Sequence, residues 1–178
     1  MKERGRFITI EGGEGTGKST LITALAAALK GRGHGVTVTR EPGGTPLAEA
    51  VRSLVLSPPG DDRWSPLAEA LLMNAARSDH IQQLILPALE RGDWVLCDRF
   101  ADSTLVYQGA GGVAETVLLA MQDEVTRRAR PDLTILLDAP GRRLAVPPVC
   151  TRYLGRIRAA LARFPRAGAP GVPADREA

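Results

Sequence analysis

The chain has 178 residues, of which 44% are hydrophobic and 24% charged, with a net charge of +3. This length and composition suit one globular domain with a buried core. No apolar run approaches the roughly 18–20 residues that a membrane-spanning helix needs. Residues 7–10 are too short an apolar run for a signal peptide. Cys97 and Cys150 are too few for a disulfide framework, and no Cys/His cluster indicates zinc. We therefore expect a cytoplasmic protein that does not bind membranes.

Charge divides the chain into two parts. Residues 1–138 contain 15 basic and 18 acidic side chains, a balance of −3, whereas residues 139–178 contain eight arginines and two acids, a balance of +6. Ala, Arg, Pro and Gly make up 27 of those last 40 residues. A basic tail can bind nucleic acid, but no regular aromatic–basic interleaving accompanies these arginines. We predict a domain over 1–138, a partly disordered tail over 139–178, and no specific nucleic-acid partner.

Strand and helix signals alternate through the first 138 residues. Short β-rich runs predict strands at 7–10, 36–39, 94–97 and 133–137. Leu- and Ala-rich stretches, bounded by Gly, Pro and Ser, predict helices at 18–30, 46–56, 66–86 and 113–129. This alternation is typical of an α/β fold with a mostly parallel sheet.

The glycine-rich segment 12–19 matches the phosphate-loop pattern G-x-x-x-x-G-K-[ST] and lies between a predicted strand and a predicted helix. Its backbone N–H groups and the positive helix end suit phosphate, Lys18 should reach the β- and γ-phosphates, and Ser19 should bind Mg²⁺. A glycine-rich turn that binds nothing is the alternative. The expected nucleotide-binding residues are Gly12, Gly13, Glu14, Gly15, Thr16, Gly17, Lys18, Ser19 and Thr20. The fold is then a P-loop NTPase-type, doubly wound parallel sheet with helices on both faces and strand order 2-3-1-4.

A regulatory GTPase is one class of protein that carries such a loop. Residues 138–141 fit D-x-x-G, but guanine-specific GTPases usually read the base with N-K-x-D. Lys2, Lys18 and Lys30 are the lysines of this chain, and none stands in that motif. The sequence therefore disfavours a GTPase.

Asp98 follows four apolar residues, at the carboxyl end of a predicted strand. Parallel α/β sheets bind ligands at this end, and phosphoryl transfer needs an acid near Mg²⁺ there. Arg99 follows at once and can pair with a substrate phosphate through its forked guanidinium. A surface ion pair is the alternative, and the phosphate loop favours the functional interpretation.

Together these segments resemble bacterial thymidylate kinase over roughly residues 6–138. The resemblance rests on Thr39 to Thr45, Ala75-Ala76-Arg77, Asp98-Arg99-Phe100 with Ser103, Tyr107-Gln108-Gly109, and Pro131 to Asp138. It implies the reaction ATP + dTMP → ADP + dTDP, with Mg²⁺ as cofactor, in a homodimeric cytoplasmic enzyme of dTTP synthesis.

The resemblance also implies a role for each matching residue. Lys18, Glu14, Asp98 and Arg99 would be catalytic, with Glu14 near the acceptor sugar and metal, and Ser19 and Asp98 would bind Mg²⁺. Arg99 and Arg40 would approach the dTMP phosphate, Arg77 the thymine edge, and Tyr107 the deoxyribose. The implied acceptor residues are Arg40, Met73, Arg77, Arg99, Ser103, Thr104, Tyr107 and Gln108. Alternatively, Tyr107 is a core residue, Arg77 a solvated helix charge and Glu41 a simple turn acid.

Two departures from the family pattern leave other functions open. Met73 stands where the family usually has phenylalanine, which predicts weaker stacking on thymine. Residues after 139 do not align with the family's arginine-bearing lid, although Gly15 implies a need for one, so we hypothesise a frameshift or gene-model error there. An inactive nucleotide-binding remnant, or a kinase for another small acceptor, remain the alternatives.

Overall fold

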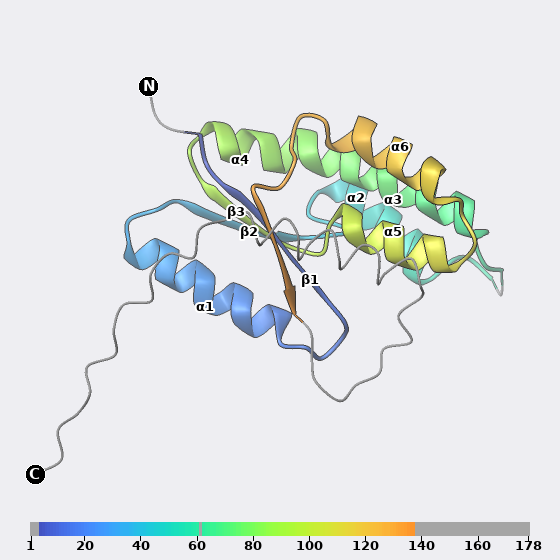
Figure 1. Cartoon of the computed structure of the whole chain (residues 1–178), viewed down its shortest axis with the longest axis horizontal. Helices are drawn as coiled ribbons and strands as arrows, with labels where there is room; N and C mark the ends of the chain where they lie inside the picture. Colours follow the sequence, from blue (N-terminus) through green and yellow to red (C-terminus); the bar gives the residue numbers. More distant parts are fainter. Residues whose placement is uncertain (1–3, 61, 138–178) are drawn as a thin grey trace, which may run out of the picture.

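The sheet of the described chain has four parallel strands in the order β2-β3-β1-β4, as predicted (Figure 1). The computed structural model describes residues 4–60 and 62–137. Within them the strands are β1 (Phe7–Gly12), β2 (Val36–Arg40), β3 (Trp94–Asp98) and β4 (Leu133–Leu137). Predictions about the 139–178 tail and about the D-x-x-G motif starting at residue 138 lie outside this range.

Helices cover both faces of the sheet, which confirms the doubly wound α/β fold. The 14-residue α1 (Lys18–Gly31) packs on one face against β1, β2 and β3. The opposite face carries the remaining described helices, seen above and to the right of the sheet in Figure 1. These are α2 (Pro46–Leu56), α3 (Pro66–His80), the π-helix η1 (Ile81–Ile85), α4 (Leu86–Glu90), α5 (Ala101–Ala110) and α6 (Glu115–Thr126).

The central strand β1 is buried on both faces, as expected for an interior parallel strand. Ile8 and Ile10 pack into the cluster under α1 that includes Ile22. Phe7 points the other way and meets the Phe100 ring edge-on, with 5.0 Å between ring centroids. Apolar packing on both faces of the sheet therefore fixes the position of β1 and of the loop that follows it.

Local signals placed several elements correctly and missed others. The bounds of α2 and β4 match the predictions, and Thr45 and Ser65 cap α2 and α3 by accepting hydrogen bonds from backbone N–H groups at 3.2 and 3.3 Å. The helix predicted at 66–86 continues to Glu90 through the π-helical turn. Helix α5 has no clear local signal and was not predicted, because its segment ADSTLVYQGA contains Ser, Thr, Val and Gly, which are weak helix formers.

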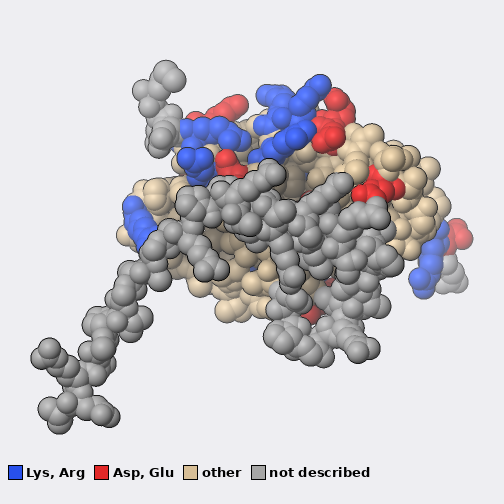
Figure 2. Space-filling model, in the orientation of Figure 1, with Lys and Arg blue, Asp and Glu red and all other residues tan. Residues whose placement is uncertain are grey.

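Charged side chains of both signs lie side by side along the upper edge of the view in Figure 2. Ion pairs on the surface include Arg127 with Glu124 and Arg130 with Asp123, at 3.0 and 3.1 Å. A surface of mixed sign produces a weaker long-range field than a patch of one sign. Among residues 4–60 and 62–137, no helix combines the length and the apolar character needed to cross a membrane.

Candidate active site

The phosphate loop connects the carboxyl end of β1 to the N-terminus of α1. Gly12, Gly15 and Gly17 have positive φ angles of 142°, 72° and 90°, which glycine adopts without steric cost. Lys18 folds back over the loop, and its Nζ donates hydrogen bonds to the carbonyl oxygens of Gly12 at 3.0 Å and Gly13 at 2.7 Å. Burial, and then the nearby Arg99 guanidinium, lowers the pKa of the Lys18 ammonium. The loop has the geometry of an anion-binding site at a helix N-terminus.

Asp98 ends β3 beside this loop. Its Oδ1 atom is buried and accepts no hydrogen bond from any described residue, and a buried carboxylate oxygen without a donor suits a cation. The Ser19 side chain, at the start of α1, is exposed to solvent. Ser19 and Asp98 are therefore the residues that could hold Mg²⁺ together with nucleotide phosphates. Three or more His, Cys, Asp or Glu side chains do not cluster as a metal site anywhere in 4–60 or 62–137.

A cavity of about 360 Å³ opens next to the loop. Its lining includes Glu14 and every predicted acceptor residue except Arg40; those residues are Met73, Arg77, Arg99, Ser103, Thr104, Tyr107 and Gln108. The other residues in the lining were not predicted as site residues; they are Glu41, Pro42, Arg52, Val55, Leu56, Glu69 and Phe100. Arginines and carboxylates thus face a partly apolar space, which suits an anionic ligand with a flat or apolar part.

Arg99 reaches this cavity from a strained turn. Its φ is +65°, a conformation that costs a non-glycine residue about 1 kcal/mol or more. Its backbone N–H donates to the Ile10 carbonyl at 2.9 Å. The guanidinium lies 5.5 Å from the centre of the Tyr107 ring and 3.4 Å from Ser103 Oγ. Tyr107 itself is 53% exposed, so it is not a core residue.

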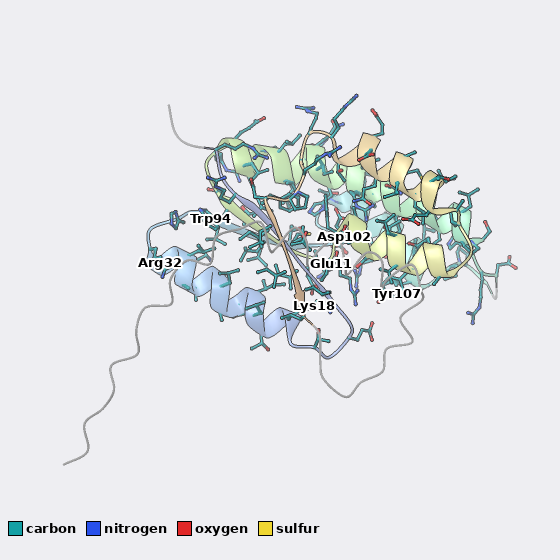
Figure 3. All side chains as sticks on the ribbon, in the orientation of Figure 1. Glu11, Lys18, Arg32, Trp94, Asp102 and Tyr107 are labelled. Atoms are coloured by element: carbon teal, nitrogen blue, oxygen red, sulfur yellow. The ribbon has the colours of Figure 1, made fainter. Side chains whose placement is uncertain are left out.

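Glu11, on β1, holds that turn in place. Its two carboxylate oxygens accept hydrogen bonds from the Phe100 N–H at 2.8 Å and from Ser103 Oγ at 2.7 Å. Burial, followed by the charge of Asp102, raises the pKa of the Glu11 carboxyl from 4.5 to about 7. Both residues are labelled in Figure 3. Sequence reasoning missed Glu11, because an acid next to a glycine loop gives no sign of partners about ninety residues away.

Arg77, on α3, is 3% exposed and is not a solvated helix charge. Its Nε donates to Glu41 Oε2 at 2.7 Å, and its Nη2 donates to Thr104 Oγ1 at 2.9 Å and to the Phe100 carbonyl at 3.3 Å. The Glu41 carboxylate is therefore not a simple turn acid either. These bonds fix the guanidinium in the wall of the cavity.

Comparison with known sequences shows the family of this chain. The family model described as thymidylate kinase matches residues 10–146. The chain belongs to the thymidylate kinase family. Over 138 residues it is 57% identical to the thymidylate kinase of Caulobacter vibrioides, and this alignment covers 77% of this chain and 66% of the relative. Over 137 residues it is 53% identical to that of Alcanivorax borkumensis, covering 76% and 65%.

A solved structure of thymidylate kinase from Ehrlichia chaffeensis is also similar. It is 34% identical, with a TM-score of 0.75, and the match covers 90% of this chain and 88% of that one. The chain spans less than two thirds of the length of the Caulobacter and Alcanivorax thymidylate kinases, 66% and 65% respectively.

Of two predicted acceptor residues of this thymidylate kinase family member, Met73 lies in the cavity lining and Arg40 does not. Met73 lines the cavity one helical turn before Arg77, the position from which a side chain could contact a bound base. Arg40 is not part of the cavity lining, and its guanidinium pairs with the exposed Glu49 at 3.1 Å. Its predicted contact with the acceptor phosphate gains no support from this arrangement and stays a prediction.

Proposed function

We propose that this chain transfers the γ-phosphoryl group of ATP to dTMP, giving ADP and dTDP. The observation that carries the proposal is that the phosphate loop and the cavity share a boundary. Glu14 belongs to the loop and also lines the cavity. Arg99 lies in the same lining, close enough to Lys18 for its charge to lower the pKa of the Lys18 ammonium. A nucleotide on the loop and an acceptor in the cavity would therefore meet between Glu14, Lys18 and Arg99.

The donor half follows from the loop. Backbone N–H groups of residues 13–18 and the ammonium of Lys18 would hold the ATP phosphates, and Thr20 follows within the first turn of α1. Ser19 and the unpartnered Oδ1 of Asp98 would hold Mg²⁺. When bound, Mg²⁺ offsets the negative charge on the phosphates during transfer.

The acceptor half follows from the cavity. Arg99 and Arg52 present cations to an acceptor phosphate, while Met73 and Tyr107 supply apolar surface for a base and sugar. Arg77 is held rigidly enough to present a polar group to a base edge. Phosphoryl transfer depends mainly on positioning and charge stabilisation, so holding both anions in one orientation is the main contribution of these residues.

We also infer that the protein functions as a cytoplasmic homodimer. Leu67 and Leu71 lie one turn apart on α3 and are 47% and 53% exposed, and Val117 on the adjoining α6 is 40% exposed. Exposed apolar side chains on packed helices suit a second copy of the chain. Size-exclusion chromatography with light scattering measures the oligomeric state directly, and a monomer at micromolar concentration would reject this part of the proposal.

The activity is tested by ADP release from Mg-ATP with dTMP, dUMP, other nucleoside monophosphates or no acceptor. We expect release stimulated by dTMP and lost in a Lys18→Met variant, with Lys30→Met as the matched control on the same helix. Binding of dTMP by calorimetry, without any turnover, would instead indicate a nucleotide-binding protein that lacks the catalytic step. Turnover with another acceptor but not with dTMP would change the proposed substrate.

A further inference from the structure

The Glu41 carboxylate is shared between two side chains of α3. Oε2 accepts from Arg77 Nε at 2.7 Å, and Oε1 lies 3.0 Å from His80 Nδ1. Residues 77 and 80 are three apart, so both reach the same side of the helix. Glu41 is 5% exposed, Arg77 3% and His80 0%. A buried carboxylate between two donors from one helix has little freedom to rotate.

His80 connects this carboxylate to the end of β2. An ionised carboxylate only accepts hydrogen bonds, so Nδ1 of His80 carries the proton that faces Glu41. The other ring nitrogen, Nε2, lies 2.7 Å from Thr39 Oγ1. The imidazole therefore has a partner at each ring nitrogen: Thr39 near the end of β2, and Glu41 two residues further along the chain.

The loop at residues 41–45 packs directly on His80 and Thr39. A Cβ atom at Gly44 would lie 2.5 Å from both His80 Nε2 and Thr39 Oγ1, so the backbone approaches them too closely for any side chain. Thr45 donates a hydrogen bond to Asp79, the residue before His80. The π-helical turn η1 begins directly after His80, and such turns often occur at functional sites.

We propose that His80 is a positioning residue for the acceptor site: its imidazole holds the Glu41 carboxylate, which in turn fixes the Arg77 guanidinium in the cavity wall. This inference rests on the proposed dTMP kinase activity. His80 does not line the cavity, so its effect reaches the acceptor through Glu41 and Arg77. Loss of the His80 contact leaves Glu41 Oε1 buried without a donor from the described residues 4–60 and 62–137, and the carboxylate then competes for the other Arg77 N–H groups.

Two near-isosteric variants separate positioning from packing. The side-chain nitrogen of asparagine occupies about the place of histidine Nδ1, so His80→Asn keeps a donor for Glu41. Glutamine reaches about the place of Nε2, so His80→Gln keeps a partner for Thr39 and loses the donor to Glu41. We expect His80→Gln to raise KM for dTMP about tenfold, with kcat and KM for ATP within about threefold of wild type, and His80→Asn to stay within about threefold throughout.

Thr39→Val is a second variant in case the histidine variants fail to fold, since valine suits a strand. It removes the other partner of His80, and we expect KM for dTMP to rise about threefold. Thr37→Val, two residues earlier on the same strand, is the matched control and should leave KM unchanged. Equal effects of the Asn and Gln variants would overturn the proposal. So would a fall in kcat together with a rise in KM for both dTMP and ATP.

A readout that needs no substrate separates this inference from the proposed function. The Arg77 Nε–H signal in ¹H–¹⁵N spectra, assigned with Arg77→Lys, should persist in His80→Asn and move or broaden in His80→Gln. An Arg77 signal that is the same in all variants rejects the positioning role even if dTMP is the substrate. A wild-type protein that neither binds nor phosphorylates dTMP rejects the proposed function, and the spectra still decide whether His80 orders Arg77.

Discussion

Replacing Glu11 by glutamine tests the buried carboxylate that joins β1 to the turn before α5. Glutamine can accept from the Phe100 N–H and donate to Ser103 Oγ, so the variant keeps both contacts and loses the charge. The folded protein holds the Glu11 proton more tightly than the unfolded chain does. The stability that this group contributes is therefore present below pH 4.5 and is lost as the pH rises through its folded pKa of about 7.

The size of the effect follows from the two pKa values. The difference between 4.5 and about 7 corresponds to about 3 kcal/mol at 1.36 kcal/mol per pH unit, most of which is lost between pH 5 and pH 8. We expect the free energy of unfolding of Glu11→Gln, minus that of wild type, to rise by about this amount from pH 5 to pH 8. Urea unfolding followed by circular dichroism at several pH values measures it.

An exposed acid provides the control for this measurement. Glu124 forms a surface ion pair with Arg127, and both side chains are 70% exposed. Glu124→Gln should therefore change the free energy of unfolding by no more than about 0.5 kcal/mol at any pH. A Glu11→Gln difference that is the same at pH 5 and pH 8, or that falls as the pH rises, would refute the reasoning.

Other substitutions test the remaining parts of the site. Met73→Phe should lower the Kd for dTMP about two- to tenfold by adding a flat ring in the cavity, as measured by calorimetry, and an unchanged Kd would show that residue 73 does not contact the base. Asp98→Asn should raise the Mg²⁺ concentration needed for half-maximal turnover about tenfold or more, and an unchanged Mg²⁺ titration would place the cation elsewhere. Leu71→Asp should convert a dimer into a monomer in light scattering, and a persistent dimer would move the interface away from α3.

Sequence patterns predicted the loops, strands and helices whose structure depends on residues close together along the chain. The glycine loop before Lys18, the strand leading to Asp98 and the capped helix starting at Pro46 each carry local signals. The predicted acceptor residues came from a family resemblance, and most of them line one cavity. Arg40 does not, because its guanidinium turns toward Glu49, a pairing that no local pattern encodes.

The residues that sequence reasoning missed depend on contacts between distant segments. Glu11 accepts hydrogen bonds from Phe100 and Ser103, which lie 89 and 92 positions further along the chain. His80 contacts Glu41 and Thr39, which lie 39 and 41 positions before it. Neither residue type indicates such partners by itself: an acid beside a glycine loop or a histidine near a helix end is common. Only the folded arrangement brings Glu11 to the turn that bears Arg99, and His80 to the carboxylate that pairs with Arg77.

The central position of β1 has a consequence for synthesis on the ribosome. Its first partner, β3, begins at Trp94, and the Phe7 N–H donates to a carboxylate oxygen of Asp132, 125 residues away. At about 5–20 residues per second, β1 waits about 6–25 s after it is made before both neighbouring strands exist. Until β3 has been made, the nascent chain presents β1 as an unpaired apolar strand, and one edge of β1 stays open until β4 follows. Translation speed and chaperone capture at this strand therefore influence how much of the protein reaches the folded state.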